Sequence, residues 1–267
     1  MKILRFYYIL LIILFLFCMA FPFFLHTSPL DTHLNAAFKP PSFSHWLGTD
    51  ELGRDIFSRI CFGARTTLLI GVFSVAFASV LGTILGLFAG FWGGKIDIFI
   101  CQCIDISLAF PSLLLAIGIT VVLPPGFFSV VIALGLTGWA SFTRLIRSET
   151  LVLKNMDYVS ASKSLGGDSF YIVFRHILPN CVYLLIISIS LQLGSFMLAE
   201  SGLSFLGLGI PQPNPTLGGM IASGKDYLYS SPWIPLFPGI LIALIVLFVN
   251  LIGDGIQKQL DPKRNKS

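Results

Sequence analysis

The sequence predicts an all-α protein that crosses a membrane six times. Hydrophobic residues make up 55% of the 267 positions, charged residues only 11%, and 25 residues are Phe. A soluble domain could not keep this much apolar surface away from water. The apolar residues also gather in six long runs separated by polar or Pro/Gly-rich segments. Both observations indicate a polytopic membrane protein built from transmembrane helices.

The predicted spans are residues 6–25, 68–92, 98–123, 127–142, 182–206 and 233–252. We divide the chain into residues 1–65 (the first helix and an extracytoplasmic segment), residues 66–256 (the main transmembrane domain) and residues 257–267 (a basic tail). A signal peptide is the alternative for residues 6–25. The apolar core of that run is too long for one, and no A-x-A site or lipobox precedes Cys18, which favours a retained span.

Proline, glycine and arginine residues predict where the inner spans are interrupted or end. Pro111 interrupts the third span, and Pro124-Pro125-Gly126 forms a tight turn into the fourth. Arg144 and Arg147 are expected to end the fourth span and to open the polar region of residues 143–181. In the second span, glycines recur at every fourth position and predict a smooth stripe for close helix packing. These glycines are Gly82, Gly86, Gly90 and Gly94.

Residues 26–65 form the longest extramembrane segment before the polar region of residues 143–181. The segment contains HWLGTDELGRDIFSRICFGART, whose charges are spaced so that helical ion pairs can form. These charged residues are Asp50, Glu51, Arg54, Asp55, Arg59 and Arg65. Such a cluster is usually the solvated face of an interfacial helix, and that is the expectation here.

The distribution of Lys and Arg predicts the orientation in the membrane. With six spans, both termini, the turn at Lys95 and residues 143–181 lie on one side. The other side holds only five of the 17 basic residues: Lys39, Arg54, Arg59, Arg65 and Lys225. The positive-inside rule therefore places both termini and residues 143–181 in the cytoplasm.

The cytoplasmic stretch YVSASKSLGGDSFYIVFRHILPN, residues 158–180, predicts two short amphipathic helices. Asp157 is placed to cap the first, which stops at Gly166-Gly167. Asp168 or Ser169 can cap the second, and Pro179 is expected to end it. This pair of helices has no obvious apolar partner in its own chain. We therefore expect a docking surface for another protein.

Several kinds of chemistry have no motif in this sequence. There is no G-x-x-x-x-G-K-[ST] nucleotide loop, no H-E-x-x-H and no G-x-S-x-G. The five cysteines form no C-x-x-C pair and the four histidines are scattered, so no metal site is expected. Asp105, Glu200 and Asp254 lie near span ends, where capping or anchoring is favoured over a proton relay. A transporter of this composition would need an energy-supplying partner.

Several motifs in order resemble one family. They are HWLGTDELGRDIFSR, GFWGGKID, LAFPSLLLAI, GWASFTRLIRSETL, FRHILPN, ESGLSFLGLGIPQPNPTLGGMI and FPGILIALIVLFVNLIGDGIQKQLDPK. Together they resemble the dipeptide/oligopeptide/nickel group of ABC-importer permeases, and within it the subunit marked by LGTDELGRD, the "C" subunit. Residues 158–180 also look like the "EAA" coupling loop of such permeases. The family pattern E-A-A-x-x-x-G is here Ser160-Ala161-Ser162 followed by Gly166, so the acidic residue is absent.

The resemblance implies a type I ABC-importer permease fold, a place in the inner (plasma) membrane of a bacterial cell and a defined set of partners. These are a second homologous permease, two ATPase subunits that hold ATP and Mg²⁺, and a periplasmic or lipid-anchored solute-binding protein. The chain itself would be no enzyme and would bind no cofactor, metal or nucleic acid. The residues expected to contact the ATPase are Ser160, Ala161, Ser162, Leu165, Gly166, Phe170, Phe174 and Pro179. The alternative for the aromatic residues is that they lie on the lipid surface.

A second group is expected to form an external gate or a contact for the binding protein: Glu200, Gly207, Gly209, Pro211 and Pro213. A plain turn is the alternative for the loop. For Glu200, a structural partner for the loop is favoured over a contact to a substrate amine. The implied cargo is a dipeptide or oligopeptide, with nickel or glutathione as alternatives. An ion-coupled secondary transporter is a less favoured function, because the spans offer no clear mid-membrane titratable group, and a membrane-embedded hydrolase would need paired His or Asp.

Overall fold

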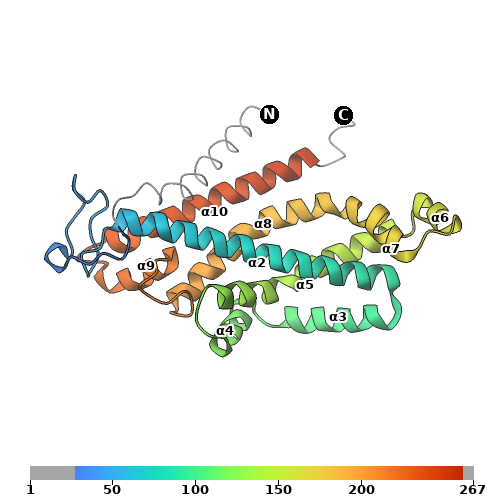
Figure 1. Cartoon of the computed structure of the whole chain (residues 1–267), viewed down its shortest axis with the longest axis horizontal. Coiled ribbons are helices and arrows are strands. Elements are labelled where there is room, and N and C mark those ends of the chain that lie inside the picture. The colour runs from blue at the N-terminus through green and yellow to red at the C-terminus, as the bar shows by residue number, and fades with distance from the viewer. Residues whose placement is uncertain (1–27, 261–267) are drawn as a thin grey trace.

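The computed structural model describes residues 28–260, which form an elongated bundle of helices (Figure 1). Within that range a single β-bridge joins Thr49 and Asp55, and long helices account for most of the chain. The long helices are α2 (Ile56–Trp92), α3 (Gly94–Ala109), α4 (Ser112–Val122), α5 (Phe127–Leu153), α8 (Leu178–Phe205) and α10 (Trp233–Leu260). The shorter helical elements are η2 (Leu34–Ala36), α6 (Asp157–Ser164), α7 (Ser169–Ile172), η3 (Val173–Ile177), α9 (Leu217–Gly224) and η4 (Lys225–Tyr227).

Four helical stretches in the described residues are long and apolar enough to cross a membrane. They are Ile56–Trp92, Phe127–Leu153, Ser169–Phe205 and Trp233–Lys258. The pair α3 and α4 passes the same test together but is bent by 95°, and it makes a fifth crossing if the bent pair is counted as one span. The first predicted span, residues 6–25, lies outside the described residues.

The bend between α3 and α4 lies at Phe110-Pro111. Phe110 is extended, with φ −93° and ψ 141°, and α4 begins one residue after Pro111. A proline disfavours the helical conformation of the residue before it and cannot donate a backbone hydrogen bond. The predicted interruption of the third span at Pro111 is therefore confirmed, and the chain changes direction there.

The helices extend further than the predicted spans. Helix α2 starts at Ile56, where the Asp55 carboxylate accepts a hydrogen bond from the Ser58 N–H. Helix α5 continues through Arg144 and Arg147, which do not end it. Helix α10 runs on to Leu260, so the start of the predicted tail is helical. Polar residues carry no penalty where a helix emerges into water, so hydropathy marks the crossing and not the helix end.

Pro179 also fails to end its helix. The chain is helical without a break from Ser169 to Phe205, and Pro179 is the second residue of α8. The preceding turn, η3, is a π-helix, in which the hydrogen bonds shift by one residue. Such a turn is one way in which a helix accommodates the N–H that proline lacks. The prediction that the second hairpin helix stops at Pro179 was wrong for this reason.

A glycine seam joins α2 to α5 along the centre of the bundle. A Cβ atom added at Gly82, Gly86 or Gly90 would lie 2.5–2.8 Å from the Cβ atom of an α5 residue. The α5 residues have the same four-residue spacing: Phe142, Ile146 and Thr150. Only glycine allows the two helix backbones to approach this closely. Gly94, the fourth glycine by spacing, opens α3 and faces open space, so the seam ends at Gly90.

Candidate functional site

The hairpin of residues 157–177 extends from one end of the bundle, where α5 ends and α8 begins (Figure 1). It consists of α6, α7 and the π turn η3. Met156, and not Asp157, occupies the N-cap position of α6, and no side chain caps that end. Asp157 is the first residue of the helix, where its charge favours the helix dipole. Asp168 caps α7 by accepting a hydrogen bond from the Phe170 N–H at 3.1 Å, which confirms one of the two predicted caps.

Gly166 makes the turn between α6 and α7. Its φ is +86°, in the left-handed region, and nothing lies within 4 Å of where a Cβ would stand. The need for glycine at this position is therefore conformational and not steric. The left-handed turn at Gly166 reverses the chain between α6 and α7.

The inner face of the hairpin packs on its own chain. Val159, Ile172, Val173 and Ile177 are at most 3% exposed and share one apolar cluster with residues of the transmembrane helices. Those residues are Leu87, Ile146 and Leu153. The prediction that the hairpin lacks an apolar partner within the chain was wrong for this face. This packing holds the inner face of the hairpin against the ends of α2 and α5.

The outer face of the hairpin remains uncovered in this chain. Leu165 is 89% exposed, Phe174 61% and Phe170 55%. The other residues predicted to contact an ATPase are exposed or half-buried: Ser160, Ala161, Ser162, Gly166 and Pro179. The structure thus brings the predicted residues of the α6–α7 turn to one end of the molecule. Only Phe170 has an aromatic neighbour in α2, Trp92, at a centroid distance of 5.6 Å.

Two polar contacts secure the same end of the bundle. The Arg147 guanidinium donates two hydrogen bonds to the Asp97 carboxylate, the Nη2–Oδ2 bond measuring 2.8 Å, and so ties α5 to α3. The Lys154 ammonium donates to the Gly90 carbonyl at 2.8 Å, across the end of the glycine seam. These contacts tie the end of α5, which leads into the hairpin, to α2 and α3.

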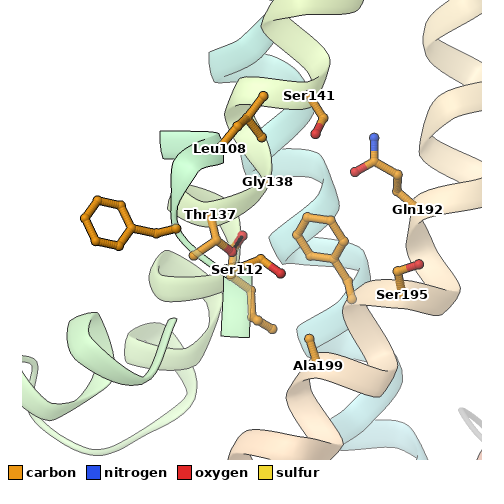
Figure 2. A pocket seen from close by; sticks show the side chains of 11 residues that line it. Leu108, Ser112, Thr137, Gly138, Ser141, Gln192, Ser195 and Ala199 are labelled. Atoms are coloured by element: carbon orange, nitrogen blue, oxygen red, sulfur yellow. Dashed lines mark hydrogen bonds between the residues drawn. The ribbon is translucent and has the colours of Figure 1, made fainter. Parts of the chain in front are cut away.

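A cavity of 370 Å³ opens between the α3–α4 bend, α5 and α8 (Figure 2). Its polar lining is Ser112, Thr137, Ser141, Gln192 and Ser195, and no lining residue is charged. Our sequence predictions missed this cavity. The available signal was the i, i+3 pair Gln192 and Ser195 within an apolar run, a spacing that places two polar groups on one helix face. No group of three or more His, Cys, Asp or Glu side chains anywhere in residues 28–260 could hold a metal ion.

The predicted gate residues gather at the opposite end of the bundle. The Glu200 side chain is buried within α8 and accepts hydrogen bonds from the Ser204 hydroxyl at 2.7 Å and the Ser201 hydroxyl at 3.4 Å. Gly209 in the following loop lies directly on Ser204, where any side chain would collide. Glu200 therefore forms hydrogen bonds within the end of α8, and the loop packs against this helix end at Ser204. The tip of that loop, which includes Pro211 and Pro213, is exposed.

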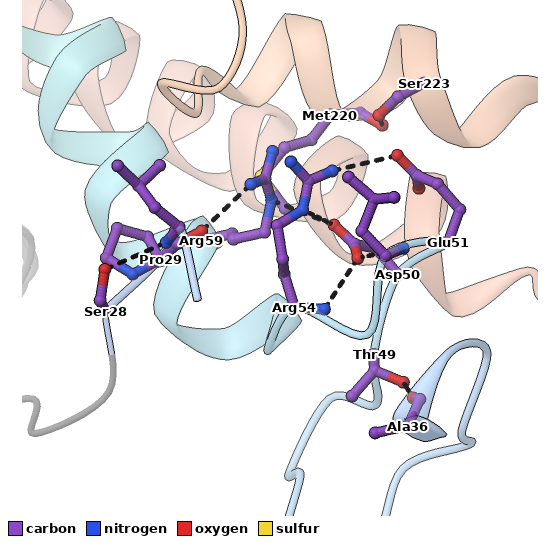
Figure 3. A network of polar contacts seen from close by, with 12 residues as sticks. Ser28, Pro29, Ala36, Thr49, Asp50, Glu51, Arg54, Arg59, Met220 and Ser223 are labelled. Atoms are coloured by element: carbon purple, nitrogen blue, oxygen red, sulfur yellow. Dashed lines mark hydrogen bonds and ion pairs between the residues drawn. The ribbon is translucent and has the colours of Figure 1, made fainter. Parts of the chain in front are cut away.

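The charged residues before α2 form a buried network (Figure 3). The Asp50 carboxylate pairs with Arg54 at 2.7 Å and lies 3.4 Å from Arg59 Nε, and Glu51 pairs with Arg54 at 3.0 Å. Asp50, Arg54 and Arg59 are at most 3% exposed. The expectation of a solvated helical face was therefore wrong, because residues 49–55 form a loop folded against the start of α2. The network holds the loop of residues 49–55 against the start of α2.

Comparisons with known proteins agree on one family. The family described as "Binding-protein-dependent transport system inner membrane component" matches residues 82–266. The dipeptide transport system permease protein DppC of Alkalihalophilus pseudofirmus is 42% identical over 91% of this chain and 80% of that protein. The oligopeptide transport system permease protein OppC of Bacillus subtilis is 39% identical over 97% and 85%. The glutathione transport system permease protein GsiD of Pectobacterium atrosepticum is 42% identical over 84% and 74%.

The fold has a counterpart among solved structures. The inward-facing MetNI methionine ABC transporter has a chain that matches 74% of this one with a TM-score of 0.59, covering 94% of its own length at 18% identity. At that identity the likeness shows the fold alone. The family match covers more than half of the chain, and the relatives match nearly all of it. The chain belongs to the family of binding-protein-dependent transport system inner membrane components, the permeases of ABC importers.

Proposed function

We propose that this chain is one of two homologous permease subunits of an importer that takes up peptides. Two ATPase subunits, which hold ATP and Mg²⁺, dock on the permeases at the hairpin end of the bundle. A solute-binding protein delivers the peptide at the other end. The chain itself binds no cofactor. Both termini and the hairpin lie in the cytoplasm of the cell, which the excess of Lys and Arg on that side supports.

The uncovered outer face of the hairpin is the observation that carries the coupling role. Leu165, Phe170 and Phe174 expose large apolar surfaces at the tip of an element that is itself fixed to the bundle. A rigid inner face and an apolar outer face are what a mechanical link between two proteins requires. Movement of an ATPase docked on the outer face would be passed through Lys154 and Arg147 to α2, α3 and α5.

We propose that the residues lining the polar cavity form this subunit's part of the transport pathway. Its hydroxyl groups and its single amide can exchange hydrogen bonds with the amides of a peptide backbone without holding a charge. Such a lining suits cargo of varied side chains. The names of the relatives, which include dipeptide, oligopeptide and glutathione permeases, support peptide-like cargo for this chain as well.

Substrate-stimulated ATP hydrolysis of the assembled complex tests the coupling role. Gly166→Val places a β-branched residue at φ +86°, which costs about 1–2 kcal/mol in the turn and disfavours the docking geometry. We expect stimulation by loaded binding protein to fall at least about fivefold. Gly126→Val is the matched control, because Gly126 has a positive φ and open surroundings but lies in the α4–α5 turn, outside the hairpin.

Two outcomes would contradict this function. Unchanged stimulation in Gly166→Val would remove the hairpin from the coupling path. Equal losses in Gly166→Val and Gly126→Val would show that the effect is general instability. Uptake measured with a dipeptide, a longer peptide, glutathione and nickel would identify the cargo, and uptake of nickel alone would refute the peptide proposal.

The exposed loop tip is proposed as a contact for the binding protein. Pro211, Pro213 and Asn214 are exposed, while the base of the loop is held against Ser204. A photo-crosslinker at Asn214 should capture the binding protein, and the yield should change between nucleotide-free and ATP-bound complexes. A yield of zero in both states would favour a plain turn.

A further inference from the structure

An exposed ion pair joins α5 to α3 beside the polar cavity. The Arg144 Nη2 atom of α5 donates to the Asp105 Oδ1 atom of α3 at 3.1 Å. The Asp105 side chain is 73% exposed and that of Arg144 59%. Both residues belong to segments that pass the test for membrane crossing.

The pair is one helical turn away from the cavity. Leu108 follows Asp105 by three residues, Ser141 precedes Arg144 by three, and both Leu108 and Ser141 line the cavity (Figure 2). One turn advances a helix by about 5 Å. Because α3 begins and α5 ends at the hairpin end of the bundle, the charged pair lies on the hairpin side of the cavity.

The surroundings of this pair must be water or protein. Asp105 lies 11 residues into α3 and Arg144 nine residues before the end of α5, which corresponds to roughly 15 Å from the helix ends. Charges that are exposed on apolar helices are costly against lipid tails and mark interior-facing or water-lined surfaces. Helices α3 and α5 are already tied by the better-buried pair Asp97 and Arg147, which shares two hydrogen bonds. The exposed pair is therefore a second and more accessible contact between the two helices.

We propose that Arg144 and Asp105 receive the charged ends of a peptide as it leaves the cavity. Arg144 binds the α-carboxylate, for which a planar guanidinium is the best side-chain partner. Asp105 binds the α-ammonium group. The inference rests on the proposed function and adds a determinant of specificity to it. The cavity lining offers dipoles but no counter-ion, and this pair, one helical turn away, offers a counter-ion for each end of a peptide.

A crossed transport experiment tests the assignment. The complete importer, with its binding protein, is reconstituted in vesicles and supplied with one peptide in three forms: free, C-terminally amidated and N-terminally acetylated. The forms are chosen so that the binding protein binds all three. For Arg144→Gln we expect the free-to-amidated ratio of uptake rates to fall about threefold to tenfold below the wild-type ratio. The free-to-acetylated ratio should stay unchanged, and Asp105→Asn should show the converse pattern.

The controls separate this role from a structural one. Discrimination by the binding protein is the same in every variant and cancels when ratios are compared. Arg144→Lys keeps the charge and should retain part of the carboxylate preference. Arg147→Gln breaks the neighbouring tie and should slow all three forms equally.

Equal losses for all three forms in Arg144→Gln would overturn the inference and assign the pair a structural role. Normal uptake of all forms by both Arg144→Gln and Asp105→Asn would overturn it as well. If the wild-type complex took up no peptide in any form, the proposed function itself would fail, which is a distinguishable result.

Discussion

The glycine seam between α2 and α5 makes a quantitative prediction about stability. In Gly86→Ala, the new Cβ would lie 2.8 Å from the Ile146 Cβ, 2.8 Å from the Thr143 carbonyl oxygen and 3.0 Å from the Arg147 nitrogen. Two of these three neighbours are backbone atoms of α5, which cannot turn aside as a flexible side chain could. Since ordinary contacts begin near 3.4 Å, the helices must separate by several tenths of an ångström.

The expected cost follows from overpacking. Added methyl groups in a tightly packed core typically cost about 1–3 kcal/mol. Alanine also gains about 1 kcal/mol of helix propensity over glycine, which hides part of this cost. Gly118→Ala isolates that gain, because Gly118 lies inside α4 and has nothing within 4 Å of a new Cβ. The difference between the two variants should therefore equal the overpacking cost.

Thermal inactivation of the purified protein in detergent measures this difference. We expect the midpoint temperature of Gly86→Ala to lie about 2–12 °C below that of Gly118→Ala, at about 2–4 °C per kcal/mol for a protein of this size. Equal midpoints, or a higher one for Gly86→Ala, would refute the reasoning. They would show that α2 and α5 are not packed as closely in the protein as their backbone contacts require.

Three further predictions concern the two ends of the bundle. Asp50→Asn should destabilise the protein by about 3 kcal/mol in thermal unfolding, because it leaves Arg54 with only one carboxylate partner, and the exposed Asp31→Asn should not. Val173→Ala should cost about 2 kcal/mol of stability, since Val173 is 3% exposed in the cluster beneath the hairpin. The adjacent Phe174→Ala should leave stability within about 0.5 kcal/mol but lower the stimulation of ATP hydrolysis severalfold. A loss of stability in Phe174→Ala together with a loss of stimulation in Val173→Ala would contradict our assignment of the inner and outer faces.

The sequence carries most of the local information about this fold. Long apolar runs identify α2, α5, α8 and α10, because each backbone group in a bilayer must be satisfied within its own helix. Pro111 predicts the bend between α3 and α4, and Gly166 together with Asp168 predicts the turn of the hairpin. These features depend on residues that are close together in the chain, and they can therefore be predicted from the amino-acid sequence.

Features that depend on distant partners were missed or misjudged. Asp50 is buried because its loop folds against distant segments: the Phe38 N–H donates to the Asp50 carbonyl, and Trp233 Nε1 donates to the Thr49 carbonyl at 3.3 Å. Charge spacing alone suggested a solvated helix. The inner face of the hairpin is covered by Leu87 and Ile146, which are distant in the chain. The polar cavity combines residues of the α3–α4 bend, α5 and α8 and has no local signature.

Site-directed crosslinking from the tip of the hairpin tests the central claim most directly. Leu165, 89% exposed, is replaced by a photo-crosslinking residue in the complete complex, and Leu34, 71% exposed at the other end of the bundle, is replaced in the control. We predict that position 165 captures an ATPase subunit, with a yield that changes on ATP binding, and that position 34 does not. Failure of position 165 to capture the ATPase in any nucleotide state would contradict the assignment of the hairpin as the coupling element.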